Sequence, residues 1–458
     1  MHPALVRHAL FPLHEWAMKR PTLSYLAEIE KAQWLSREEL EALQARKLKD
    51  LLATAQAHSP WHAERIQAAG LEPSSGGPLT LADLPKLPTM TRADASANRD
   101  RLVWKEAPGG VFPYTTGGSS GQPLIFYFGR KRQAADAACR FRARRWWGQD
   151  VGEREVFLWG APVELNKTDR IKTLRDRLFN QLLLNAFEMK PERMDDYLVA
   201  IERFNPRCIY GYASSLALLA AHAKSRGNSL KLPDLRVVGA TGEPLYPEQR
   251  AIIQEVFGAP AANEYGCRDG GLVALESPDG QMLVNSESII LEVLDAQGRA
   301  VAPGEMGEAV LTHLCSEAQP FIRYRTGDMV RQSDAHCRAG RGLHVIAEVV
   351  GRRTDFVVKP DGTIMHALAV IYVLRAVKGV GEFKIIQHAT DRLEVQIVPD
   401  AYWQDCAKDL ITEQLRARMG ASVAVDIELK QSIPPEASGK HRYVVSHVSL
   451  PDNLLVAE

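Results

Sequence analysis

The chain has 458 residues, and its 56 lysines and arginines are balanced by 56 aspartates and glutamates. A chain of this length usually forms more than one folding unit, so two or three are expected. The neutral balance gives no basis for binding nucleic acid or a membrane through bulk charge. No apolar run approaches the ~20 residues of a transmembrane helix, and the charged N-terminal residues lack a signal-peptide core.

The six cysteines are scattered along the chain without a C-x-x-C pair, and the 13 histidines show no metal-ligand spacing. This usage argues against a disulfide framework or a zinc knuckle and fits a reducing compartment. We therefore expect a cytoplasmic protein.

The first elements along the chain are helical. Residues 22–58 predict a helix, because apolar side chains recur at three- and four-residue spacing and Ser36 precedes two glutamates in a capping pattern. Strands are expected at Phe112–Thr115 and Pro123–Phe128. The next segment, "RKRQAADAACRFRARRWW", predicts a helix with many arginines. Such arginines are most simply ion-paired or solvated, although nucleic acid or the phosphates of a small-molecule ligand are alternative partners.

Strands and helices alternate further along. "REVFLWGAP" and "LRVVGATGEPL" predict buried strands, a helix starts at Pro247, and "IILEVLD", "GEAVLTHL" and "FIRYRTGDMV" alternate as β-strands. This order predicts an α/β core with a β-rich part. A boundary near Val349–Gly362 leaves about 100 residues with a compact α+β pattern, the size of a small domain. We therefore predict an N-terminal domain at 1–350 and a C-terminal domain at 351–458.

The stretch "YTTGGSSGQP", Tyr114–Pro123, lies between the two predicted strands. Glycines allow close approach of a ligand, and backbone amides and hydroxyls can bind an anion, so phosphate is the expected guest. A flexible hairpin turn is the alternative. Gln122 stands where ordinary NTPase loops have lysine, and a strand rather than a helix follows.

Three other segments combine a strand with a polar loop: "GATGEPL", "NEYGCRDGG" and "YRTGD". Each alone is an ordinary turn, since turns favour glycine and aspartate. In α/β sheets, however, ligands bind at loops beyond the carboxyl ends of strands. Together with the glycine loop, these segments indicate one ligand site.

In this order, and together with "SGKHR" near the C-terminus, the motifs resemble those of the adenylate-forming enzymes, the acyl-CoA synthetase and ligase superfamily. Within it the chain is most similar to the phenylacetate–CoA ligase-like branch and its capsule- and exopolysaccharide-associated relatives. The resemblance covers nearly the whole chain. It implies an α/β fold with a large N-terminal domain and a small mobile C-terminal domain, and it implies ATP and Mg²⁺ as cofactors with CoA as the default acceptor.

The resemblance also implies site residues. The glycine loop would hold the phosphates, Tyr265 would stack on the purine and Asp328 would accept hydrogen bonds from the ribose. The implied ATP-binding residues are Thr115, Thr116, Gly117, Gly118, Ser119, Ser120, Gly121, Gly242, Glu243, Pro244, Glu264, Tyr265, Gly266, Asp328 and Arg352.

The implied catalytic residues are Lys440, Asp269 and Arg268. Lys440 corresponds to the family's mobile lysine, which stabilises charge during adenylation. The family pattern after "YG" has Thr or Ser and then Glu, whereas this chain has Cys267–Arg268–Asp269; Asp269 can still present a carboxylate to Mg²⁺. Arg268 is available for phosphate or the substrate carboxylate, or is an ordinary ion-paired side chain. The hinge is assigned to Thr354.

The resemblance places an acyl pocket near Trp159, Tyr210, Tyr212 and Ala240. Packing in the core is the alternative role for such aromatic residues. The expected activity is ATP-dependent formation of an acyl-adenylate and pyrophosphate from a small carboxylic acid, followed by transfer to the thiol of CoA. Transfer to a carrier-protein thiol or an amine, and a catalytically degenerate nucleotide-binding protein, are the alternatives. The acid, the pathway and the oligomeric state are not indicated.

Overall fold

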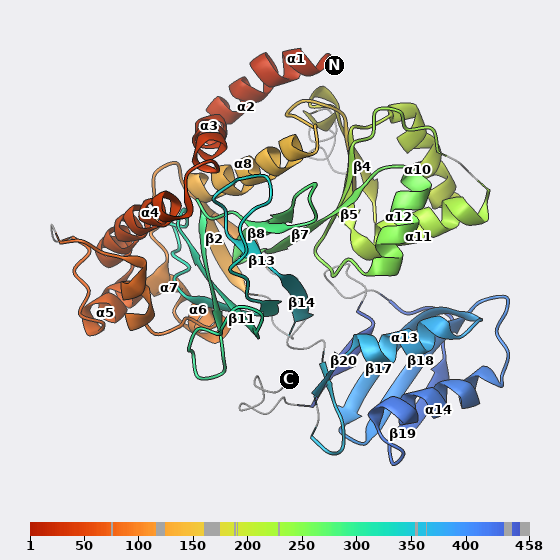
Figure 1. Ribbon diagram of the computed structural model, residues 1–458. Helices are drawn as coiled ribbons and strands as arrows, with labels where there is room; N and C mark the ends of the chain where they lie inside the picture. Colours follow the sequence, from red (N-terminus) through yellow and green to blue (C-terminus); the bar gives the residue numbers. More distant parts are fainter. Residues whose placement is uncertain are drawn as a thin grey trace. The chain divides into compact units, whose positions relative to one another are not determined.

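The computed structural model describes residues 1–74, 77–115, 124–159, 175–186, 189, 191–227, 230–352, 356–362, 364–434 and 442–448. The chain forms two compact units (Figure 1). The larger contains Met1–Leu294, Ala300–Thr326 and Val330–Val349, and the smaller contains Asp295–Arg299, Gly327–Met329 and Val350–Glu458.

An eight-stranded sheet forms the centre of the larger unit, in the order β13-β9-β8-β7-β6-β5-β3-β4. Strands β4, β3, β5, β6 and β7 are parallel, whereas β8, β9 and β13 pair antiparallel. The parallel strands are short and mostly apolar, as strands covered on both faces are. The strands are β3 Glu155–Trp159, β4 Gln181–Asn185, β5 Cys208–Tyr212, β6 Val237–Thr241, β7 Ala261–Cys267, β8 Gly271–Glu276, β9 Met282–Val284 and β13 Val345–Ile346.

Helices cover both faces of this sheet, which confirms the predicted α/β architecture. On one face, α10 (Pro191–Phe204), α11 (Ala213–Ser225) and α12 (Pro247–Phe257) bury a cluster of aliphatic side chains (Figure 1). On the other face lies α8 (Arg130–Trp146), the predicted arginine-rich helix. Helix α3 (Thr22–Ala32) packs against α8 and shares its apolar cluster.

The N-terminal segment predicted as one helix over residues 22–58 contains two. Helix α3 ends at Ala32, and α4 spans Arg37–His58. The backbone of Ser36 is extended, and its hydroxyl accepts a hydrogen bond from Glu39 N (3.1 Å) while Glu39 Oε2 accepts one from Ser36 N (2.8 Å). This capping box starts a new helix, so the capping signal was correct but the continuous helix was wrong.

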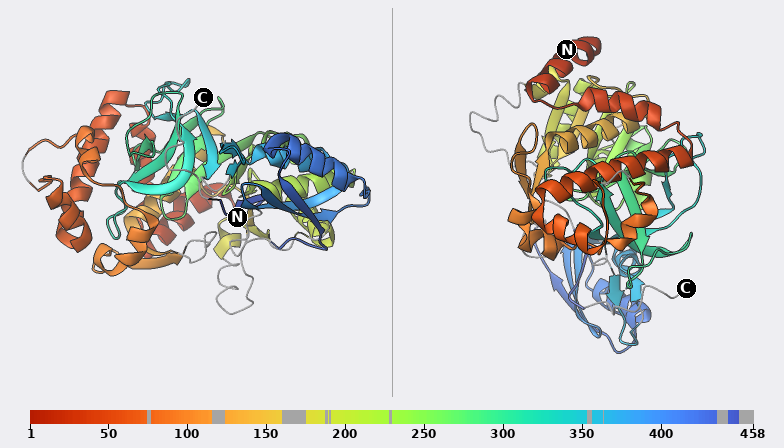
Figure 2. Two further views of the ribbon diagram at one scale, coloured as in Figure 1. Left: turned by 90° about the horizontal axis from the view of Figure 1, so that it is seen from below. Right: turned by 90° about the vertical axis from the view of Figure 1, so that its left-hand side faces the viewer.

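The other helices within residues 1–102 lie on the outside of the larger unit, in red to orange in Figure 2. They are α1 Pro3–Leu5, a π-helical stretch Val6–Leu10, α2 Phe11–Ala17, α5 Pro60–Ala68, a 3-10 helix Leu81–Lys86, α6 Arg92–Ala97 and α7 Arg99–Leu102.

The predicted hairpin around the glycine loop is confirmed by its strands. Strand β1 (Val111–Thr115) pairs antiparallel with β2 (Ile125–Gly129), and Thr115 lies opposite Ile125. The loop residues between Thr116 and Pro123 lie outside the described residues.

A four-stranded sheet has the order β10-β11-β12-β14. Its strands are β10 Ile289–Leu294, β11 Met306–His313, β12 Tyr324–Arg331 and β14 Glu348–Arg352. The "YRTGD" segment was expected to be a strand followed by a loop, but it lies within β12. The strand continues because Gly327 adopts φ +75°, a conformation that glycine reaches without steric cost, where a loop had been expected.

The smaller unit has the α+β composition expected from its sequence. Its sheet has the order β19-β18-β17-β20, and two helices bury an aliphatic core against it. A separate hairpin pairs β15 with β16. The elements are β15 Phe356–Val358, β16 Ile364–His366, α13 Leu368–Ala376, β17 Val380–Ala389, β18 Arg392–Pro399, α14 Ala407–Met419, β19 Ala424–Leu429 and β20 Val444–Ser446.

None of the described helices combines the length and apolar character needed to cross a bilayer. The six cysteines are free thiols, and Cys406 is the exposed one among them.

Three arginines of α8, Arg132, Arg142 and Arg144, are buried and ion-paired rather than solvated. The Arg142 guanidinium is fully buried; it donates to the Glu287 carboxylate and to Asn285 Oδ1 (2.7 Å). Glu287 is itself fully buried. Because neither charge reaches water, each depends on the other for compensation.

We predict that Arg142→Met destabilises the protein by about 3–5 kcal/mol, because Glu287 would remain buried without its partner. Urea unfolding followed by tryptophan fluorescence measures the change. The matched control is Arg226→Met, which removes an exposed pair with Asp195 and should cost less than about 1 kcal/mol. Equal losses for the two variants would contradict the assigned role of the buried pair.

Candidate functional site

The β7–β8 turn carries two of the predicted catalytic residues, Arg268 and Asp269. The turn closes at Gly271, which has φ +104°; a Cβ atom there would lie 2.5 Å from Cδ2 of His313. A side chain would therefore be strained in conformation and would collide with the imidazole. This constraint accounts for the second glycine of "CRDGG".

Asp269 is held from two sides. Its side chain is buried, and Oδ2 accepts a hydrogen bond of 2.5 Å from the Tyr324 hydroxyl. The buried Arg132 guanidinium of α8 donates to the Asp269 carbonyl oxygen at 2.7 Å. Burial and the neighbouring Asp269 carboxylate raise the pKa of Tyr324 well above its ordinary value, so this hydroxyl stays a donor. The carboxylate therefore has a fixed position in the turn.

Arg268 joins this turn to the glycine loop. Its side chain is exposed, and Nη1 donates to the carbonyl oxygen of Thr115 at 2.8 Å. Thr115 is the last residue of β1 and the first of the predicted phosphate-binding residues. Two motifs separated by about 150 residues thus meet at one place. The other predicted loop residues, Thr116, Gly117, Gly118, Ser119, Ser120 and Gly121, lie outside the described residues.

The Asp269 carboxylate can hold Mg²⁺ only if phosphate oxygens also bind the ion. Protein-bound Mg²⁺ usually takes one or two carboxylates and completes its shell with phosphate oxygens and water. Asp269 supplies one fixed carboxylate. Across the described part of the chain, no group of three or more His, Cys, Asp or Glu residues could hold a metal by itself. The arrangement suits an ion that arrives with a nucleotide.

The "GEP" turn follows β6. Gly242 has φ +76°, a region that favours glycine, and it turns the chain out of the strand. Glu243 Oε2 accepts a hydrogen bond from Ser214 N (2.9 Å) at the start of α11, next to Tyr212. Pro244 lies in the connection to α12. This turn therefore lies beside an element that carries a predicted acid-binding residue.

The "EYG" segment of β7 sends its side chains to opposite faces, as strand geometry requires. Tyr265 is 7% exposed and packs with Val273 and Ala309. Glu264 lines the α8 face of the sheet. Gly266 lies so close to the next strand that a Cβ would be 2.9 Å from Gly271 O. Stacking of Tyr265 on a purine remains a prediction.

Three of the four predicted acid-binding residues form an aromatic group. Trp159 stacks on Tyr212 with ring centroids 4.4 Å apart and an interplanar angle of 20°, and it lies nearly parallel to Tyr210 at 5.8 Å. Tyr210 and Tyr212 are buried, and burial raises the pKa of both. Ala240 is fully buried in the core beneath α10, α11 and α12. Contact of these residues with an acid remains a prediction.

A polar network lies beside Tyr210. Glu264 Oε1 accepts hydrogen bonds from the Tyr210 hydroxyl and from Thr241 Oγ1 (2.9 Å). Two arginines of α8 lie over the Tyr210 ring, with Cζ of Arg140 at 5.2 Å and Cζ of Arg144 at 4.8 Å from its centroid. The α8 face of the sheet therefore combines aromatic and charged groups.

The other predicted residues belong to the smaller unit or lie outside the described residues. Asp328 is buried within β12, and Arg352 is the last residue of β14. Lys440 and Thr354 lie outside the described residues. Their roles in catalysis and as a hinge remain predictions.

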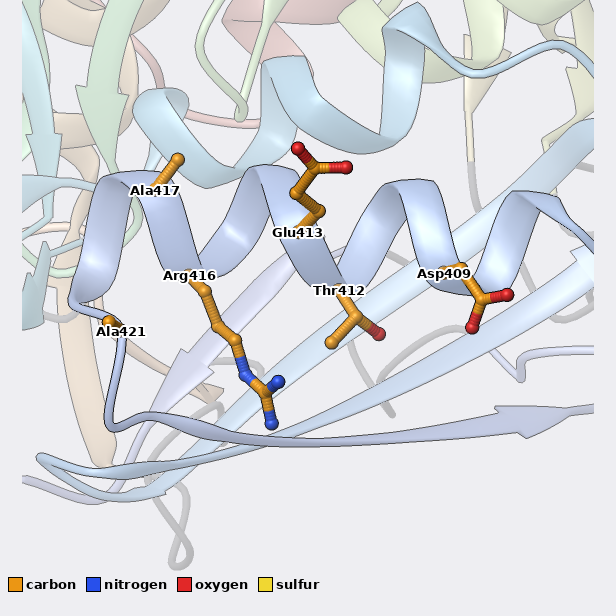
Figure 3. A pocket seen from close by; sticks show the side chains of 6 residues that line it. All are labelled: Asp409, Thr412, Glu413, Arg416, Ala417 and Ala421. Atoms are coloured by element: carbon orange, nitrogen blue, oxygen red, sulfur yellow. The ribbon is translucent and has the colours of Figure 1, made fainter.

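A surface groove of the smaller unit runs along α14 and is shown in Figure 3. Asp409, Thr412, Glu413 and Arg416 project from this helix into view, and Arg416 Nε donates to Val423 O at 2.9 Å. None of the residues predicted from the sequence lines this groove.

Sequence analysis missed two residues that position the site. Arg132 supports the Asp269 turn and Tyr324 binds its carboxylate. The sequence contained only weak signals for them: one arginine among many in α8, and the tyrosine that opens the "YRTGD" segment.

Comparisons with known proteins show what the chain is similar to. Residues 357–447 match the family described as the CapK C-terminal domain. Protein CapK of Staphylococcus aureus is 22% identical over 435 residues, which cover 94% of each chain. Phenylacetate–coenzyme A ligase of Thermus thermophilus is 23% identical over 412 residues, covering 83% of this chain and 86% of the relative.

A solved structure shares the fold. The 2-hydroxyisobutyryl-CoA ligase in the postadenylation state, in complex with R3-HIB-AMP, superposes with a TM-score of 0.70 at 20% identity and covers 91% of both chains. The motifs, the two-unit α/β fold and relatives that align along almost the whole chain lead to one assignment. These findings support an adenylate-forming, phenylacetate–CoA ligase-like family for the chain.

Proposed function

We propose that the protein activates a small carboxylic acid with ATP and transfers the acyl group to a thiol, by default that of CoA. In the first step a carboxylate oxygen attacks the α-phosphorus of ATP, the bond from that phosphorus to the bridging oxygen breaks, and pyrophosphate leaves. In the second step a thiol sulfur attacks the acyl carbonyl carbon, the thiol proton is lost, and AMP leaves with the bonding electron pair.

The observation that carries the proposal is the junction between the β7–β8 turn and the glycine loop. The hydrogen bond from Arg268 to Thr115 O brings a cationic side chain to the start of a loop rich in hydroxyls and backbone amides. Asp269 is fixed in the same turn. A site that must hold phosphate, a metal ion and a carboxylate needs these groups together.

Each residue has a proposed task. The glycine loop would bind the phosphates, and Asp269 would hold Mg²⁺, which supplies positive charge to screen the phosphate oxygens. Arg268 would orient the acid carboxylate, since its fork matches a carboxylate or phosphate edge. Tyr265, with the "GEP" turn, would bind the adenine, and Asp328 the ribose hydroxyls.

The smaller unit would complete the site. Lys440 would donate hydrogen bonds to the carboxylate and the α-phosphate while negative charge develops between them, and a preorganised donor is most effective there. A movement of this unit about Thr354 would then replace the lysine with the acceptor thiol. We propose that both steps take place in the cytoplasm, where free thiols such as the six of this chain persist.

ATP–pyrophosphate exchange across a panel of carboxylic acids tests the proposal. Acid-dependent exchange without CoA is expected, and mass spectrometry after addition of CoA, a carrier protein or amines then identifies the acceptor. A protein that binds ATP but exchanges pyrophosphate with none of the acids would overturn the proposal in favour of a degenerate nucleotide-binding protein.

Lys440→Ala should lower acid-dependent exchange by ~10²–10³-fold, the usual effect of losing one donor to the transition state. Binding of ATP, followed by calorimetry, should change little. The matched control is Lys430→Ala in the same unit, which removes an exposed pair with Glu428. Undiminished exchange in the Lys440 variant would remove the lysine from the mechanism.

Asp269→Asn should raise the Mg²⁺ concentration needed for half-maximal exchange by about tenfold or more, because a neutral amide is a poorer ligand for a hard cation. Tyr324→Phe keeps the carboxylate but removes its hydrogen bond, so its effect should have the same direction and be smaller. Magnesium titrations of the exchange rate compare the three proteins. An unchanged Mg²⁺ requirement in Asp269→Asn would exclude this residue as the ligand.

A further inference from the structure

A small pocket lies between α8 and the eight-stranded sheet, on the face opposite to α10, α11 and α12. Arg144 and Trp147 line it from the helix side, and Tyr210, Gly239 and Glu264 line it from β5, β6 and β7. Gly239 makes room for the tyrosine, since a Cβ there would lie 3.0 Å from Tyr210 Cδ2. Sequence analysis predicts Tyr210 as a residue of the acid site, but the proposed function leaves the charged groups of this pocket without a task.

Arg144, which lines the pocket, carries a donor without a partner among the described residues. The residue is 7% exposed, and its Nη1 donates to Glu155, to Gln149 (3.2 Å) and to Cys208 (2.9 Å). Its Nη2 is buried and has no hydrogen-bond partner among the described residues. A buried donor without a partner is uncommon in folded proteins and indicates a missing ligand or water.

Glu264 adds an acceptor to the pocket lining, and Arg140, which contacts Tyr210 and Glu264 beside the pocket, adds a second donor. Tyr210 and Thr241 donate to Glu264 Oε1, whereas among the described residues Oε2 forms a long ion pair of 3.9 Å with Arg140 Nε. That Nε atom is also buried without a hydrogen-bond partner among the described residues. Arg140 and Arg144 are four residues apart, so they share one face of α8. The Arg140 side chain remains 38% exposed and lies nearer to solvent.

These groups specify the chemistry of the ligand. Guanidinium donors need an oxygen acceptor, and Glu264 Oε2 needs a donor. A hydroxyl group both accepts and donates one hydrogen bond and satisfies the two requirements together. A second carboxylate would accept from the arginines but would face the negative Glu264 oxygen, and an apolar group would leave all of them unpaired.

Resting on the proposed function, we propose that this pocket recognises a hydroxyl group on the acid substrate, with Arg140, Arg144 and Glu264 as specificity-determining residues. The substrate is then a hydroxylated carboxylic acid. Sequence analysis expected Glu264 in the ATP site; this inference assigns its side chain to the acid.

The test compares acids that differ only in a hydroxyl group: phenylacetate with its 3- and 4-hydroxy derivatives, and benzoate with the corresponding hydroxybenzoates. Calorimetry on the full chain measures their dissociation constants without requiring turnover. The best hydroxylated acid should bind at least about tenfold more tightly than its parent, because a site built for a hydroxyl rejects the analogue that lacks it.

Arg140→Met and Glu264→Gln should bring this ratio to about one. In the Glu264→Gln variant, the amide oxygen can still accept hydrogen bonds from Tyr210 and Thr241. The amide nitrogen, which is a donor, then takes the place of the carboxylate oxygen Oε2. Arg145→Met is the matched control: it lies on the same helix, is 34% exposed and pairs with Glu30 and Asp150. Its ratio should equal that of the unmodified protein.

The outcomes separate this inference from the proposed function. A hydroxyl preference that disappears in the two variants supports the inference even if no acid supports pyrophosphate exchange. Equal binding of each pair, no binding of any hydroxylated acid, or a preference that survives in both variants would overturn it and leave a pocket that holds only water.

Discussion

Helix α8 carries three arginines, Arg132, Arg142 and Arg144, into the interior, and each buried guanidinium must find partners there. Arg142 is paired with Glu287, Arg144 with Glu155, and Arg132 donates to the backbone of the β7–β8 turn. The helix thus fixes the loop before β10, strand β3 near one edge of the sheet and the turn that carries Asp269. An uncompensated charge at any of these points would be costly, so the geometry of the site is coupled to the stability of the core.

This constraint explains why residues distant in sequence meet. The turn held by α8 presents Asp269 to the Tyr324 hydroxyl and Arg268 to the end of β1, where the glycine loop begins. On the same helix, Arg140 and Arg144 face Tyr210 and Glu264. One element therefore supports both the proposed phosphate end of the site and the proposed acid end, about two to three helical turns apart along α8.

Local patterns predicted the strands, the helices of the core and the hairpin around the glycine loop, because periodicity and turn residues act over a few positions. The errors arose where a single residue changed the local secondary structure. The cap at Ser36 divided the helix predicted over residues 22–58, and Gly327 allowed β12 to continue where a loop had been predicted. The comparisons support the family that the resemblance indicated, and the structure brings Arg268 to Thr115, where the glycine loop begins. Pairing such as Tyr324 with Asp269 depends on the packing of two sheets, and no sequence pattern encodes it.

The central claim is that the glycine loop, the β7–β8 turn and the α8 face of the sheet bind one acyl-adenylate. A crystal structure with a non-hydrolysable acyl-sulfamoyl adenosine carrying a hydroxylated acyl group measures this directly. The account predicts the sulfamoyl group beside Arg268 and the glycine loop, the purine against Tyr265, and the acyl hydroxyl between Arg144 and Glu264. Electron density for the analogue at any other place on the protein would contradict it.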